Sequence, residues 1–164
     1  MKNKFISNNL TSPIIEELTE EDKQHHKANV LFHSLELHPA IVRVSKKLFI
    51  DKHYAHAILE AFKSVNNMVK SKSGKTSLDG KNLMTTVFSK NNPILKINRL
   101  ITPTDQDEQE GYMHLFAGAM LGIRNPKAHD EIVQNNPLLT IKLLCLASLL
   151  AEKTDKTTKN ELAS

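Results

Sequence analysis

The chain has 164 residues, the size of one domain that can bury a substantial core. Hydrophobic residues make up 40% of it, aromatic residues only 5%, and Trp is absent, so we expect an aliphatic core of packed helices. The single cysteine, Cys145, cannot form an intrachain disulfide and is expected to be a small buried hydrophobe. We see neither a signal peptide nor an apolar stretch long enough to span a bilayer. These features predict a cytoplasmic, soluble protein without membrane contact.

The formal net charge of +4 is unevenly distributed along the chain. Residues 41–100 hold 12 basic and 3 acidic side chains, whereas the segments before and after them are acidic. A basic middle between acidic ends indicates a surface that faces a polyanion. The alternative is that these cations are ordinary solvated lysines on helix faces, and the charge distribution alone favours this alternative.

The first half of the chain predicts a polar arm followed by two helices. Residues 1–36 are polar with weak periodicity, and we expect an arm with one or two short helical turns. A helix is predicted after Pro39, and Asp51 is expected to cap the next one. In that second helix apolar residues recur at helical spacing: Ala55, Ile58, Leu59, Phe62, Val65 and Val69.

The second half predicts three more helices. A short helix is expected from about Lys81 to Phe88. A long one follows a predicted capping box of Thr104 and Asp107, and its apolar face is Tyr112, Leu115, Phe116, Ala119, Met120 and Ile123. Asn136 and Pro137 open a last helix that is apolar almost all round and therefore central.

No strand pattern and no internal repeat is visible. The prediction is an all-α bundle with a long antiparallel helix hairpin at its core. Its parts are an arm (1–36), a helical domain (37–154) and a solvated tail (155–164).

Two groups of potential metal ligands have ordinary structural explanations. The acidic run from Asp105 to Glu110 complements the positive end of a helix dipole. His53 and His56 are two ligands without a third. We therefore predict no metal site and no cofactor.

Arg124 and His129 flank an Asn-Pro pair at the end of the long patterned helix. On a continuous helix the two side chains would diverge. Pro126 should kink or stop the helix and bias Asn125 away from the helical region, so that Asn125 caps a new turn. Arginine and histidine could then point into one space. The alternative is that this stretch is only a helix end with its cap and no shared site. Taken alone, the Arg124 and His129 pair favours this alternative.

Arg124, the polar Asn125 and His129 together resemble the R-x(4–6)-H motif of the HEPN superfamily. The segments "LHPAIVRVSKKLFIDKHYAHAILEAFKSV", "DGKNLMTTVFS", "NPILKIN" and "DEQEGYMHLFAGAMLGIRNPKAHD" are similar, in that order, to the Ymh-like HEPN family of bacterial defence-associated proteins. The resemblance covers roughly residues 37–152. One subgroup has a tyrosine two residues beyond the histidine, where this chain has Glu131. Regulation through such a tyrosine is therefore not expected.

The resemblance implies a helical homodimer whose two motifs face each other across a shared cleft. Many members look like metal-independent ribonucleases of toxin–antitoxin, abortive-infection or anti-phage systems. Others bind RNA or nucleotide without cutting, or assemble with a defence partner, and this silent module is our alternative. A purely structural bundle is a third hypothesis.

The residue types suit RNA cleavage that uses the substrate's own 2′-OH. His129 can transfer the proton, Arg124 can hold phosphate oxygens, and Asn125 can position either group. The residues expected to hold the RNA backbone come from the motif and from the basic segment: Lys127, Arg43, Lys46 and Lys47.

Overall fold

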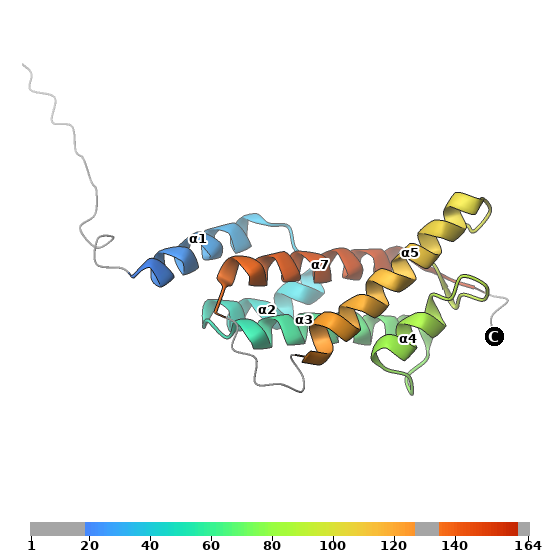
Figure 1. Cartoon of the computed structure of the whole chain (residues 1–164), viewed down its shortest axis with the longest axis horizontal. Helices are drawn as coiled ribbons and strands as arrows, with labels where there is room; N and C mark the ends of the chain where they lie inside the picture. The colour runs from blue at the N-terminus through green and yellow to red at the C-terminus, as the bar shows by residue number, and fades with distance from the viewer. Residues whose placement is uncertain (1–18, 127–134, 161–164) are drawn as a thin grey trace, which may run out of the picture.

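The computed structural model describes residues 19–126 and 135–160. Within them the chain forms six α-helices: α1 (Glu20–Ser34), α2 (Pro39–Ile50), α3 (Tyr54–Ser73), α4 (Gly80–Val87), α5 (Pro103–Ala119) and α7 (Pro137–Lys156) (Figure 1). A π-helical turn, η1 (Met120–Arg124), continues α5, and two short strands, β1 (Leu95–Lys96) and β2 (Thr158–Lys159), pair antiparallel. The all-α prediction is confirmed. The strand pair was not expected, because two residues are too few to show an alternating pattern.

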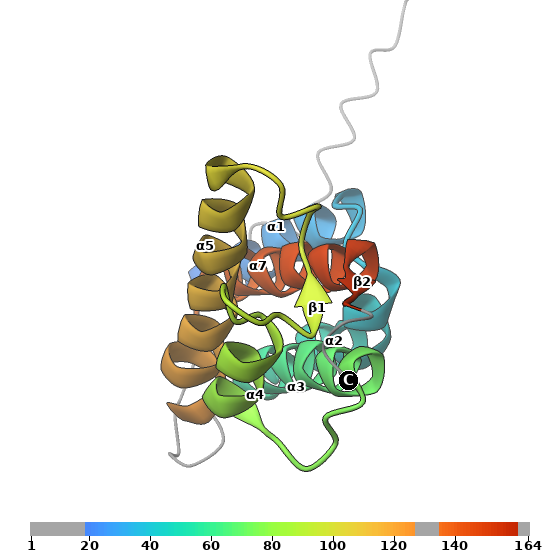
Figure 2. The same ribbon diagram turned by 90° about the vertical axis from the view of Figure 1, so that its right-hand side faces the viewer.

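The helix α3 is the centre of the bundle. Its most extensive contacts are with α2 and α7, and it also contacts η1 and α4. The helix α2 runs antiparallel to α3, whereas α7 runs in the same direction as α3 (Figure 1). The second view shows α2 and α5 on opposite sides of α3 (Figure 2). Helix α3 therefore separates the surface formed by α2 from the one formed by α5 and η1.

The core is largely aliphatic, as the composition predicts. Along α3, Ile58, Val65 and Val69 are fully buried. Phe88 and Phe116 form a stacked aromatic pair inside the bundle, with ring centroids 4.5 Å apart. Cys145 is only half-buried, and the desolvation of its thiol raises its pKa. No helix in the described part of the chain combines the length and the apolar character needed to cross a membrane.

The start of α7 is predicted correctly, but the capping box of α5 lies two residues earlier than expected. The Asn136 side chain accepts a hydrogen bond from the backbone N–H of Leu139 at 2.9 Å. The helix α5 begins at Pro103, because Thr102 and Asp105 form a reciprocal capping box before it. Pro103 then occupies the first helical position, where its fixed φ fits and its missing N–H is not needed.

The start of α3 also differs from the prediction. Its N-cap is His53, whose side chain makes no capping hydrogen bond. Asp51 lies instead at the end of α2, where its carboxylate accepts a hydrogen bond from Lys47 Nζ at 2.6 Å. Asp51 lies three residues before the start of α3 and directly after α2, and it closes α2 as its C-cap.

Residues 20–34 form one continuous helix rather than the short turns that we expected. Ala28 and Phe32 of α1 are buried, and the Phe32 ring stacks on Phe49 of α2 with 5.0 Å between centroids. His25 Nδ1 lies 2.5 Å from the hydroxyl oxygen of Tyr54. The helix docks through few apolar residues on a polar background, so its sequence shows little periodicity. Residues 1–18 lie outside the described residues.

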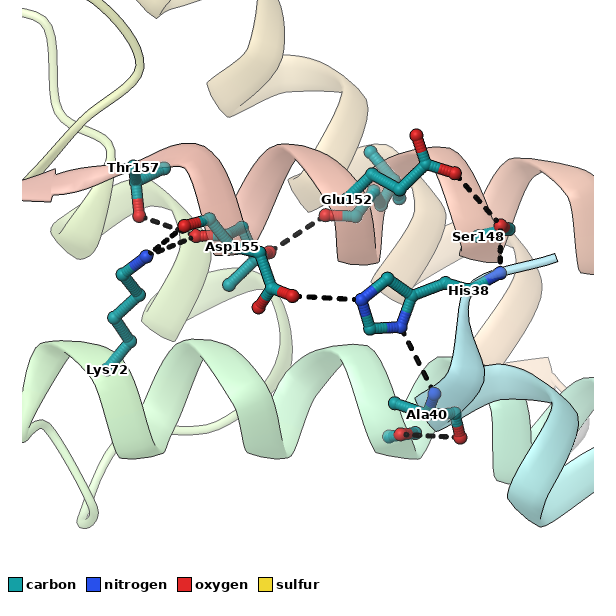
Figure 3. Close-up of polar contacts among 10 residues, drawn as sticks. His38, Ala40, Lys72, Ser148, Glu152, Asp155 and Thr157 are labelled. Carbon is teal, nitrogen blue, oxygen red and sulfur yellow. Dashed lines mark hydrogen bonds and ion pairs between the residues drawn. The ribbon is translucent and has the colours of Figure 1, made fainter. Parts of the chain in front are cut away.

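The end of α7 is tied to α2 and α3 by side chains (Figure 3). Lys72 Nζ donates a hydrogen bond to the carbonyl oxygen of Asp155 at 2.6 Å, and His38 Nε2 lies 2.9 Å from Asp155 Oδ2. Thr157 is buried just beyond the helix. The segment 155–160, expected as a solvated tail, is thus held to the bundle by its backbone, although most of its side chains are exposed.

Candidate functional site

Arg124 is the last residue of the π-helical turn that follows α5. The backbone N–H of Asn125 bonds to the carbonyl of Met120, five residues earlier. Asn125 stays in the right-handed helical region (φ −64°, ψ −46°), so the prediction that it leaves this region and caps a new turn is wrong. Pro126 lacks an N–H, and its ring would crowd a carbonyl one α-helical turn earlier. Widening the turn relieves this clash without breaking the helix, and π-turns are frequent at functional sites.

The guanidinium of Arg124 is held by two neighbours. Its Nη2 lies 3.0 Å from Asp79 Oδ2, and its Nη1 donates to Asn125 Oδ1 at 3.3 Å. The side chain is only 19% exposed. The buried Nε has no hydrogen-bond partner among the described residues. Asp79 and Asn125 therefore orient the guanidinium, and its Nε is unpaired among residues 19–126 and 135–160.

Asp79 joins the Arg124 side chain to α3. It occupies the N-cap position of α4, yet its side chain makes no capping hydrogen bond. Its Oδ1 accepts instead from Asn66 Nδ2 at 2.8 Å and lies 2.9 Å from Lys70 Nζ. The hydrogen bond from Lys70, then that from Asn66 and the charge of Arg124, lower the pKa of the Asp79 carboxyl. The carboxylate is therefore charged at neutral pH.

Asn66 completes this network from inside the bundle. It is 1% exposed, and its Oδ1 accepts the backbone N–H of Gly80 at 3.0 Å. Gly80 has a left-handed backbone (φ +53°) that suits glycine and turns the chain from Asp79 into α4. The result is a polar network that connects α3, the start of α4 and the end of η1.

Asp79, Asn66 and Lys70 were not predicted from the sequence as site residues. Asp79 and Gly80 read as an ordinary turn, and Asn66 lies among the apolar residues of α3. Their relation to Arg124 arises from tertiary packing between α3 and η1, which no local pattern reveals.

Of the predicted catalytic residues, Arg124 and Asn125 lie side by side in this network. His129 and the predicted RNA-binding residue Lys127 lie outside the described residues. Their positions relative to Arg124 therefore stay a prediction.

The predicted RNA-binding residues of α2 lie far from the Arg124 network within one protomer. Arg43, Lys46 and Lys47 belong to the helix that packs on the opposite side of α3 from α5 (Figure 2). Lys47 is already paired with Asp51 at 2.6 Å. A single protomer thus does not gather these cations around Arg124.

Of the potential metal ligands, Asp105 and Glu110 have structural roles. Across residues 19–126 and 135–160, no three His, Cys, Asp or Glu side chains are close enough to hold a metal ion. The rings of His53 and His56 are 6.4 Å apart. Asp105 belongs to the capping box of α5, and Glu110 pairs with Lys90 at 2.7 Å.

Comparison with known proteins gives one family. The family described as "Protein of unknown function (Hypoth_ymh)" matches residues 35–154. No curated protein and no solved structure matches the chain.

Proposed function

The chain belongs to the Hypoth_ymh family, and from the Arg124 network we propose that it is a metal-independent endoribonuclease of the HEPN type. The observation that carries the proposal is the guanidinium of Arg124, 19% exposed and oriented by Asp79 and Asn125. It lies at a π-turn, five residues before His129 in the sequence. An oriented, partly buried guanidinium suits the recognition of phosphate oxygens.

In this proposal the 2′-oxygen of the RNA attacks the adjacent phosphorus, and the bond from phosphorus to the 5′-oxygen breaks. His129 accepts the proton of the 2′-OH or supplies the proton to the leaving 5′-oxygen. Arg124 stabilises the negative charge on the phosphorane. The products are a 2′,3′-cyclic phosphate and a 5′-hydroxyl. One histidine does not serve easily as both acid and base, so we propose that two copies of the chain share the site.

The outer face of α5 and η1 supports the proposal of a homodimer. Leu115 and Leu121 are about half exposed, at 51% and 47%. Gly118 and Gly122 are exposed on the same helix, and a Cβ atom added at either would meet no atom of another described element within 4 Å. Small and apolar residues on an open helix face allow close approach of a second helix.

We propose that the dimer acts in the cytoplasm in toxin–antitoxin, abortive-infection or anti-phage defence, with an antitoxin or another defence protein as a further partner.

The ion pair between Arg124 and Asp79 favours a second candidate function. An arginine that already has an internal counter-ion can serve a purely structural purpose. The chain would then be a non-catalytic HEPN module that binds RNA or nucleotide, or that assembles with a defence partner.

The experiment that separates the two functions is cleavage of labelled RNA by the pure protein in excess EDTA. We expect wild type to produce 2′,3′-cyclic phosphate ends, and His129→Ala to bind RNA without cutting it. His26→Ala, which changes an exposed histidine of α1, is the matched control and should retain activity. An RNA with one 2′-deoxy substitution at the cut site should be bound but not cut. Cleavage by His129→Ala at the wild-type rate would exclude the mechanism, and RNA binding without cleavage by wild type would favour the silent module.

A further inference from the structure

A second candidate binding site lies at the strand pair, at the end of the molecule that faces the viewer in Figure 2. An open groove of about 490 Å³ is formed there by β1, the loop after it, the end of α7 and β2. Its lining residues include three cations and no carboxylate: Lys96, Ile97, Asn98, Arg99, Ile101, Lys156 and Thr158. None of the three cations forms an ion pair with another described residue. We call this site the basic groove.

The backbone that carries Lys96 is fixed by a buried glutamine. Gln109 is fully buried, and its Oε1 accepts the backbone N–H of Ile97 at 2.8 Å. Its Nε2 donates to the carbonyl oxygen of Leu95 at 3.0 Å and to that of Phe88 at 3.1 Å. The residues before and after Lys96 are therefore both bonded to one side chain, and Lys96 is held at a defined place on the groove wall.

The backbone that carries Arg99 is fixed in a similar way by Asn98. Asn98 Oδ1 accepts the backbone N–H of Leu100 at 2.9 Å, and Leu100 adopts a left-handed conformation with φ 57°. Asn98 Nδ2 donates to the carbonyl oxygen of Asp105 at 2.9 Å and to Glu108 Oε2 at 2.8 Å. A left-handed leucine is unfavourable by itself and persists where the surroundings hold it. The loop thus presents Arg99 from a rigid turn.

Lys156 reaches the groove from the opposite wall. It is the last residue of α7, whose end is tied to α3 through Lys72 and is followed by the buried Thr157. The pairing of Lys96 with Thr158 joins the two walls. Three cations from two separate segments therefore converge on one groove, and the contacts that place them do not involve their charged ends.

A larger groove in the described part of the chain differs in its charges. It measures about 600 Å³ and contains Arg43, Lys63 and Lys72. Lys63 pairs with Glu60 at 2.7 Å, and Lys72 donates to backbone carbonyls at the end of α7. Its positive charge is largely satisfied inside the protein, whereas that of the basic groove is not.

We propose that the basic groove binds the phosphodiester backbone of a single-stranded nucleic acid, at a site remote from Arg124. Three cations that line one groove and form no ion pair with a described residue attract a chain of phosphates, and their fixed backbones reduce the ordering that binding requires. The three cations would contact phosphates, and such contacts carry no sequence information and do not distinguish RNA from DNA. The identity of the ligand as RNA rests on the proposed function, whereas anion binding by the groove does not.

The test compares two triple variants with equal loss of charge. The groove variant carries Lys96→Gln, Arg99→Gln and Lys156→Gln. The control carries Lys27→Gln, Lys75→Gln and Lys142→Gln, which are exposed lysines outside both grooves. Affinity for a labelled single-stranded DNA and for an RNA of the same sequence is measured by anisotropy over a series of salt concentrations, in the His129→Ala background so that RNA stays intact.

We expect the groove variant to bind both oligonucleotides at least about tenfold more weakly than the control variant at low salt. The plot of the logarithm of the association constant against the logarithm of the salt concentration should become less steep by about 2. Each of the three lost phosphate contacts to a single strand contributes about 0.7 to its steepness. Equal affinities and slopes for the two variants, or an effect on RNA alone, would overturn the proposal. The proposal would also be overturned if the His129→Ala protein with all three cations in place bound neither oligonucleotide. If the triple variant unfolds, Arg99→Gln, at an exposed side chain, is compared with Lys142→Gln in the same way.

The outcome is independent of the cleavage experiment. A protein that binds through the groove but never cuts RNA would contradict the proposed function and leave the groove assignment standing. A protein that cuts RNA and binds it equally well without the three cations would contradict only the groove assignment.

Discussion

The carboxylate of Asp79 lies 3.0 Å from the guanidinium of Arg124, and so connects the start of α4 to the end of η1. The same carboxylate lies 2.9 Å from Lys70 Nζ. Two cations therefore share one anion, and the group of three keeps an excess of positive charge. A phosphate that approaches Arg124 would still be attracted, while Asp79 holds the guanidinium in one orientation.

The first prediction concerns this pair. Asp79→Ala should lower the free energy of unfolding by roughly 1–3 kcal/mol, because Arg124 and Lys70 lose a shared partner in a partly buried place. Asp79 is 46% exposed, so we expect the lower end of that range. Urea denaturation of Asp79→Ala, Arg124→Ala and the double variant measures the coupling, for which we expect about 1 kcal/mol. Fully additive effects would show that the ion pair does not orient Arg124.

The pair of Asp79 and Arg124 should also make the free energy of unfolding depend on pH in the acid range. The pKa of Asp79 is lowered in the folded protein, so its contribution is fully present above the unfolded value of 3.8 and is lost as the pH falls through the folded value. Repeating the denaturation of wild type and Asp79→Asn at neutral and acidic pH tests this. The difference in unfolding free energy between the two proteins should shrink toward acid pH, and a constant difference would contradict the assignment.

The second prediction concerns Gln109. Gln109→Leu should lower the free energy of unfolding by about 3 kcal/mol or more, because it removes three hydrogen bonds and leaves their backbone partners without one. Gln106→Leu, on an exposed position of the same helix, is the control and should change stability by less than about 0.5 kcal/mol. Similar effects of the two substitutions would show that the amide of Gln109 does not hold β1.

Most of the helices could be predicted because they leave a local signature. Ile58, Phe62 and Val65 repeat at helical spacing, and Asn136 before Pro137 marks a helix start. The helix α1 could not be predicted in full, because its docking depends on isolated apolar residues such as Phe32 rather than on a continuous stripe.

The site was only partly predictable for a similar reason. Arg124 and Asn125 belong to one short motif, whereas Asp79 comes from another part of the chain and takes an N-cap position without capping. The basic groove joins β1 to the end of α7 through a pairing of two-residue strands. Contacts of this kind depend on the assembled fold, and single-sequence patterns do not contain them.

The third prediction concerns self-association. Light scattering should give about twice the chain mass of 18.5 kDa for wild type. Gly118→Leu should shift the protein toward the monomer, because the added side chain would occupy the space that a second copy needs. A Cβ at Gly118 meets nothing within 4 Å in the protomer, so helicity by circular dichroism should be unchanged. A monomeric wild type that nevertheless cuts RNA would exclude a shared site.

The last prediction concerns the docking of α1 through His25. Burial lowers the pKa of His25 below its ordinary value of 6.5, and the nearby charge of Lys52 lowers it further. The unfolded chain therefore takes up a proton first, so this part of the stability is present above pH 6.5 and declines as the pH falls below it. Thermal unfolding should show a larger drop in Tm between about pH 7.5 and about pH 5.5 for wild type than for His25→Gln, which does not titrate. His26→Gln, at the exposed neighbouring position, should keep the wild-type drop. If His25→Gln and His26→Gln behave alike, the contact between His25 and Tyr54 does not govern the acid sensitivity of the fold.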